Sequence, residues 1–160
     1  MGFVDIFFFP VYVYFFYVLF KSYRKTFTDP VLARYHLVGF WVKIVATVAF
    51  TIFNLYLSQG DSYLLYHGEG TNMKDLILKD PKYLKFLYES GKDFDQSLLR
   101  NSLNRGYFRD ENNYMVARLA AIFSFFTFNR YLLNNLFFSM ISAETSAIPF
   151  TANLKTVFPS

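Results

Sequence analysis

The chain has 160 residues, enough for one domain, and a formal charge of +4. Aromatic residues make up 22% of the sequence, and 22 residues are Phe. This composition is typical of lipid-facing helices and interfacial belts rather than of a soluble core. The sequence contains no Cys, which excludes disulfides and thiolate metal sites. The small positive charge, without a basic run interleaved with exposed aromatic residues, argues against nucleic-acid binding.

The first apolar run covers residues 3–20 and predicts a transmembrane helix. It lacks the basic start and the cleavage site of a signal peptide, so we expect the helix to be retained. Residues 21–36 form a connection that is rich in Lys and Arg and carries a single acid, Asp29. Because cytoplasmic loops gather Lys and Arg, we expect this connection in the cytoplasm and the N-terminus outside it.

A second apolar run, residues 37–58, predicts the second transmembrane helix. Asp29-Pro30 is typical of a helix start, so this helix is expected to begin before the span itself. Lys43 lies within the span. Its ammonium either reaches back to the headgroups or pairs with a carboxylate or a lipid phosphate inside the membrane.

Residues 59–112 are polar with nearly balanced charges, which indicates one long extracytoplasmic loop. Apolar residues recur there at roughly helical spacing, and Asp80-Pro81 marks a helix start. We therefore expect two or three short amphipathic helices lying on the membrane surface.

The third apolar region, residues 114–149, is too long for one straight spanning helix and carries Asn129-Arg130 in its middle. A break near residues 128–130 would give an interfacial helix over 113–128 and a third span over 130–147. A single kinked helix is the alternative. Residues 148–160 are expected to be a tail without a domain of their own.

Several polar side chains gather where the second span ends, in the stretch GDSYLLYHGEG. Asp61 is the candidate general base or ligand of a divalent cation, and Tyr63, Tyr66, His67 and Glu69 are its candidate supporting residues. The alternative is an interfacial cap, with the Tyr residues in the aromatic belt. Two acids and one His without fixed spacing do not specify a metal.

Basic residues lead into the third apolar region, among them Arg105, Arg109 and Arg118. Arg guanidinium groups suit phosphate and pyrophosphate. These three are candidate phosphate ligands, and Arg118, with Ala and Leu around it, is the best candidate for contacting a lipid-linked phosphate near the interface. The alternative is that they reach into the headgroup phosphates of the bilayer.

The stretches DPVLARYHLVGFWVKI, QGDSYLLYHGEG and NNYMVARLAAIFSFFTFNRYLLNNLFFSMIS resemble the amino-terminal part of a group of uncharacterised polytopic membrane proteins from Bacteroidetes-type bacteria. The resemblance covers residues 5–142. That group is in turn similar to GT-C-type glycosyltransferases and polysaccharide polymerases. Such enzymes carry a catalytic acid just after a spanning helix, often with a nearby Tyr. By position the resemblance implies Asp61, with Tyr63 or Tyr66 beside it.

The sequence thus predicts an all-α integral membrane protein with about three transmembrane helices, forming a single membrane domain in the bacterial inner membrane. The resemblance implies the amino-terminal module of a glycosyltransferase-like protein that uses polyprenyl-phosphate sugars in cell-envelope glycan assembly. Because such enzymes have eight or more spans, we expect a fragment or a truncated relative. The alternative is a non-catalytic subunit that packs against other transmembrane helices. Membrane lipid is an expected partner in both cases.

Overall fold

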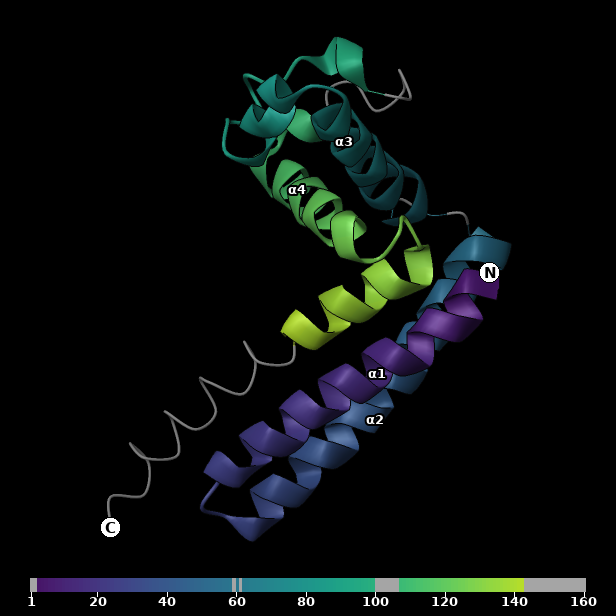
Figure 1. Ribbon diagram of the computed structural model, residues 1–160, viewed down its shortest axis with the longest axis vertical. Coiled ribbons are helices and arrows are strands. Elements are labelled where there is room, and N and C mark those ends of the chain that lie inside the picture. The colour runs from purple at the N-terminus through teal and green to yellow at the C-terminus, as the bar shows by residue number, and fades with distance from the viewer. Residues whose placement is uncertain (1–2, 59, 61, 100–106, 143–160) are drawn as a thin grey trace. The chain divides into compact units, whose positions relative to one another are not determined.

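The computed structural model describes residues 3–58, 60, 62–99 and 107–142, and within them it contains helices and no strand. The chain divides into two compact units, one of residues 1–50 and 135–160 and the other of residues 51–134 (Figure 1). Helical structure is thus confirmed as the fold class. The predicted single domain takes the form of two compact units.

The first unit is built on two long helices, α1 (Phe3–Tyr23) and α2 (Pro30–Phe53). Between them lie a short 3-10 turn, Arg24–Thr26, and three linking residues. The predicted start of α2 is confirmed, because the Val31 N–H donates to Asp29 Oδ1 at 2.8 Å. Most of the predicted connection over 21–36 is therefore helical.

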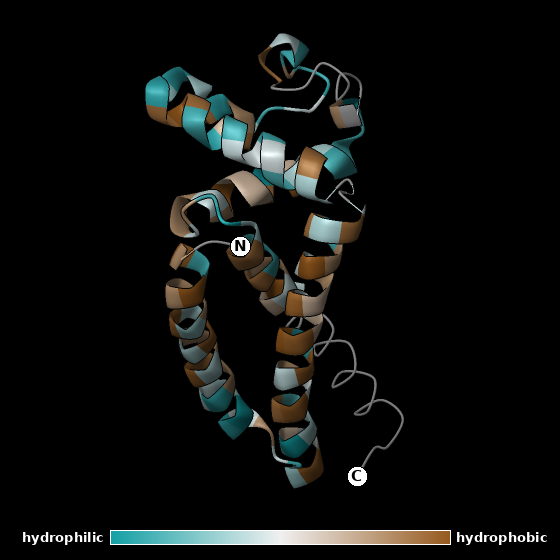
Figure 2. Cartoon of the chain, turned by 90° about the vertical axis from the view of Figure 1, so that its right-hand side faces the viewer, coloured by the Kyte–Doolittle hydropathy of each residue, from teal (hydrophilic) through white to brown (hydrophobic). Residues whose placement is uncertain are grey.

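Aromatic side chains join these helices. Phe20 of α1 lies 5.0 Å from Phe40 of α2 between ring centroids, and residues 135–142 add Leu136 and Met140 to the same cluster. Away from this cluster the helices expose apolar side chains, Phe3 at 84% for example. In Figure 2 hydrophobic colour dominates both long helices.

Two helical stretches, Phe3–Thr26 and Ala33–Ser58, are long and apolar enough to cross a membrane. The third predicted span, 130–147, is described only over 131–142, where the chain is helical. Those 12 residues are too few to cross a bilayer, and residues 143–147 lie outside the described part. A third span remains a prediction.

The second unit has a buried core of its own. Its main helices are α3 (Gly68–Lys79) and α4 (Glu111–Phe126), and short 3-10 segments over Pro81–Leu87, Gln96–Leu98 and Tyr107–Arg109 connect them. The π-helical segments Asn54–Ser58 and Ser62–His67 lead into α3. The short helices expected in residues 59–112 thus pack around one core with α4. The buried members of that core are Met73, Phe86, Phe94, Leu99, Phe108, Tyr114, Ala117 and Ala121.

Local contacts explain how these helices begin and approach each other. Asp80 accepts from the Lys82 N–H and Asp110 from the Asn112 N–H, both at 3.0 Å, so each caps the helix that follows. Gly70 allows α3 to lie close against α4, since a Cβ there would stand 2.7 Å from Ala120 Cβ and 2.9 Å from Ala121 N. The close approach of α3 and α4 therefore depends on a small residue at position 70.

The predicted break between α4 and the last helix is confirmed. Phe128 and Asn129 have φ angles of 52° and 58°, in the left-handed region. Asn tolerates this conformation, whereas a bulky Phe does so at a cost of about 1–3 kcal/mol. The Arg130 N–H donates to Thr127 O at 3.0 Å and closes the turn. The break separates α4 from the helix over 131–142.

Candidate functional site

A hollow of about 390 Å³ lies in the second unit, at the start of α3. This volume falls within the usual range for small-molecule sites. The side chains and backbone around it come from the π-helical segment before α3, from the first residues of α3 and from the break after α4. The lining residues are Tyr63, Leu64, His67, Gly68, Glu69, Thr71 and Asn129.

His67 forms one wall of the hollow as a neutral imidazole. Its Nδ1 lies 2.8 Å from Asn134 Nδ2, which donates to it. The Asn129 backbone carbonyl accepts from the other ring nitrogen. Burial lowers the pKa of His67 to about 4, and the Asn129 hydrogen bond opposes this shift only in part. Near pH 7 His67 is therefore a neutral ring whose one lone pair accepts from Asn134, which leaves none for a metal.

Behind His67 a buried hydrogen-bond network fixes the position of Asn134, whose side chain is 1% exposed. Thr127 Oγ1 donates to Asn134 Oδ1 at 2.7 Å, and Asn134 Nδ2 also donates to Ser124 Oγ at 3.2 Å. Ser124 Oγ in turn donates to the Ala120 carbonyl at 2.7 Å. The side chains of Thr127, Asn134 and Ser124 are all hydrogen-bonded within this network, so it holds the His67 ring in one orientation.

Glu69, Thr71 and Tyr63 supply the polar and aromatic surface of the hollow. Glu69 is 1% exposed, and its Oε2 accepts a long 3.4 Å hydrogen bond from Asn72. The Thr71 hydroxyl is buried and makes no hydrogen bond to the described residues. The Tyr63 ring stacks on His67 with 6.1 Å between centroids and 20° between planes. A carboxylate, an unused hydroxyl and an aromatic ring thus meet at one place.

The far side of the hollow is the left-handed turn, and Lys74 of α3 holds it. Lys74 Nζ donates to Asn129 Oδ1 at 2.6 Å and lies 3.1 Å from Asp75 Oδ1. The Lys74 hydrogen bond to Asn129 and the hydrogen bond between the Asn129 backbone and His67 together hold the turn in a conformation that is strained at Phe128. Strained backbone held in this way is frequent at binding sites.

The predicted site residues are therefore brought together only in part. Tyr63, His67 and Glu69 line the hollow, whereas the Tyr66 hydroxyl donates to Asn113 Oδ1 at 3.0 Å. Asp61 lies outside the described residues. Sequence reasoning missed Thr71 and Asn134. Asn134 is a polar residue in an otherwise apolar helical stretch, whereas Thr71 lies in the polar stretch GEGTNMKD and carries no such signal.

The predicted phosphate ligands lie elsewhere. Arg105 is outside the described residues, and Arg109 is exposed. Arg118 Nη2 donates to Glu111 Oε1 at 3.1 Å and to the Glu89 backbone carbonyl, while its guanidinium lies over the Tyr114 ring, 4.2 Å from the centroid. Arg118 therefore fastens the loop at Glu89 to α4, and its predicted phosphate contact would compete with these partners.

Within the described part of the chain, no group of three or more His, Asp or Glu is placed to hold a metal ion. Comparisons with protein-family models, with curated proteins and with solved structures found no match to this chain. The hollow is thus interpreted from its own chemistry alone.

Proposed function

We propose that α1 and α2 cross a membrane and that the second unit binds the sugar part of a polyprenyl-phosphate-linked substrate in cell-envelope glycan assembly. Insertion is supported by the exposure of the two long helices. Only 11% and 22% of their most apolar windows are buried. The core helix of a soluble protein would be mostly buried, whereas lipid covers such surfaces at no cost.

The hollow at His67 is the observation that carries the ligand proposal. The Tyr63 ring offers an apolar face for the C–H face of a pyranose. Glu69 can accept from sugar hydroxyls, and the Thr71 hydroxyl can both donate and accept. Because His67 is neutral and fixed, the site as described suits binding and orientation rather than proton transfer.

Catalysis would require a further group, and Asp61 stands next in the chain to Ser62, just before the hollow-lining Tyr63. In this proposal Asp61 is the general base. Asp61→Asn then leaves ligand binding intact and lowers glycan formation by about 10²–10⁴-fold. Asp29→Asn serves as its control, since Asn also caps helices.

Binding is tested with the purified full chain and a short-chain polyprenyl-phosphate hexose, followed by native mass spectrometry. Glu69→Gln and Tyr63→Leu should each weaken binding by about 5- to 30-fold, the equivalent of 1–2 kcal/mol for a lost charged hydrogen bond or ring contact. Asp93→Asn is the matched control, because Asp93 is an exposed carboxylate of the same unit that does not line the hollow. Equal binding by all four proteins would refute the ligand proposal.

A second candidate is a non-catalytic subunit that packs against other transmembrane helices. The favouring observation is the large apolar side chains on the outside of α2, such as Trp41 at 49% and Val45 at 68% exposure. Copurification of a membrane partner that is lost in Trp41→Ala, with sugar binding absent, would favour this function.

A further inference from the structure

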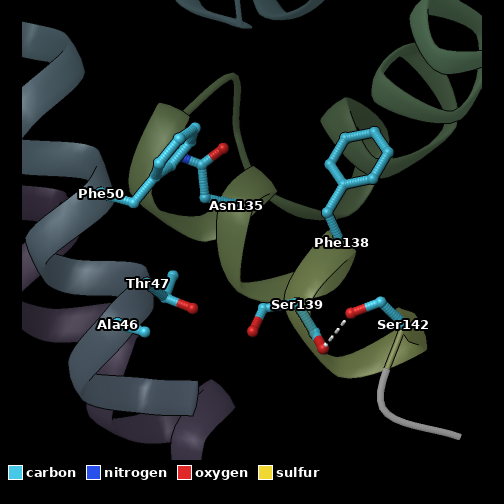
Figure 3. Close-up of a pocket in the computed structure, with 7 residues that line it drawn as sticks. All are labelled: Ala46, Thr47, Phe50, Asn135, Phe138, Ser139 and Ser142. Atoms are coloured by element: carbon cyan, nitrogen blue, oxygen red, sulfur yellow. Dashed lines mark hydrogen bonds between the residues drawn. The ribbon is translucent and has the colours of Figure 1, made fainter. Parts of the chain in front are cut away.

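A groove of about 420 Å³ lies in the first unit, between α2 and the helix over residues 135–142. Ala46, Thr47 and Phe50 line it from α2, and Asn135, Phe138 and Ser139 line it from the other helix (Figure 3). Its walls are mainly apolar, and its size is that of a small-molecule site. If α2 spans a membrane, this groove faces hydrocarbon.

Lys43 stands one helical turn before Thr47, at the end of the groove. Its Nζ donates to the Ser139 carbonyl at 3.3 Å and to Ser142 Oγ at 3.2 Å, and both of these residues line the groove. An ammonium has three donor hydrogens, so one remains for a ligand. At this end of the groove the Lys43 ammonium can therefore meet a polar headgroup.

The two ends of the groove differ, because Lys43 lies at only one of them. Lys43 meets residues 139–142, whereas the lining residue Phe50 of α2 comes seven residues later. Side chains on a helix tilt toward its N-terminus, so the Lys43 stem points toward the end of α2 that carries the basic connection. Lys43 follows Leu37, the start of the apolar run, by six residues, or about 9 Å along the helix. A Lys side chain that extends toward the membrane surface spans much of these roughly 9 Å.

We propose that this groove holds one acyl chain of an anionic phospholipid whose phosphate is bound by Lys43. The choice of occupant follows from charge complementarity and from the direction of the groove. The Lys43 ammonium lies at the end near the membrane surface, and Phe50 lies deeper. The basic residues Lys21, Arg24, Lys25 and Arg34 at the same membrane face would attract the same lipids. The inference rests on the proposed insertion of α2.

The test uses the full chain in detergent, with phosphatidylglycerol and phosphatidylcholine as probes, and reads lipid retention by native mass spectrometry. The wild type should retain phosphatidylglycerol preferentially. Lys43→Gln should lose about fivefold in affinity for it, and Lys43→Arg should keep it. Ala46→Phe should fill the groove and lower retention of both lipids. Lys92→Gln, which removes an exposed cation of the second unit that does not line the groove, is the matched control.

Equal retention of the two lipids by the wild type would overturn the inference, as would unchanged phosphatidylglycerol binding in Lys43→Gln. Insertion is read separately, from resistance of the membrane-bound chain to alkaline extraction. If the chain is extracted, the proposed insertion fails and this inference fails with it. If it resists extraction but shows no lipid preference, this inference alone fails.

Discussion

The two units stabilise their helices in different ways. In the first unit the helices meet through a narrow aromatic cluster and expose most of their apolar surface, with Ile6 at 72% and Val42 at 61%. In the second unit Phe86, Phe108 and Tyr114 are fully buried, and Asp80 and Asp110 cap the helices after them. Exclusion of water thus stabilises the second unit from within, whereas the first unit leaves many large apolar side chains exposed, which is consistent with the proposed membrane insertion.

The largest expected effect sharpens this contrast between units. Phe86→Ala removes a ring that is 0% exposed and should destabilise the second unit by about 3–5 kcal/mol. Phe7→Ala removes a ring that is 62% exposed in α1 and should change stability by less than about 0.5 kcal/mol. Hydrogen exchange of the amides in α3 and α4, measured by mass spectrometry, reports both. Similar protection in the two variants would contradict a separate core.

A pH effect is expected in the second unit. Burial lowers the pKa of His67 from 6.5 to about 4 in the folded state. Between these values the unfolded state binds more protons, so stability should fall as the pH drops from about 6.5 toward 4. Below pH 4 the free energy of unfolding should be lower by on the order of 3 kcal/mol, and above pH 7 this decrease should be absent.

Hydrogen exchange of α3 and α4 between pH 4 and 7, corrected for the intrinsic exchange rate, measures this slope. His67→Gln should flatten it, and His36→Gln, a change in the first unit, should leave it as in the wild type. An equally steep slope in His67→Gln would show that other groups cause it.

A smaller effect comes from two glycines inside helices. At Gly70 a Cβ would collide with α4, so Gly70→Ala should destabilise the second unit by about 1–3 kcal/mol. At Gly39 in α2 a Cβ would meet nothing within 4 Å. Gly39→Ala should therefore be neutral or stabilise the helix by about 0.5–1 kcal/mol. Thermal melting compares the two, and the reverse order would refute the close approach of α3 and α4.

Local features of this fold could be predicted from the sequence because their causes are local. Asp29 and Asp80, each followed by Pro, predict the starts of the helices after them, and Asn129-Arg130 in an apolar run predicts a break. The core of the second unit could not be foreseen, since Phe94 and Phe108 meet Tyr114 only through tertiary packing. For the same reason the Asn134 bond to His67 and the Arg118 bond to Glu111 were not anticipated.

The candidate site shows the same division. Tyr63, His67 and Glu69 lie near one another in sequence and lie around one hollow in the structure. Asn129, some 60 residues later along the chain, completes the hollow through the turn that follows α4. One wall of the site could thus be predicted from residues that are close in sequence, whereas the opposite wall depends on the packing of α3 against α4.

The central proposal is that α1 and α2 cross the membrane, with the connection between them in the cytoplasm and residues 59–112 outside it. The chain has no Cys, so single Cys residues can report it directly. Lys25 and Lys92 are both exposed. In spheroplasts a membrane-impermeant maleimide should label Lys92→Cys at once and Lys25→Cys only after permeabilisation. Labelling of Lys92→Cys only after permeabilisation, or equal labelling of both before it, would contradict this topology.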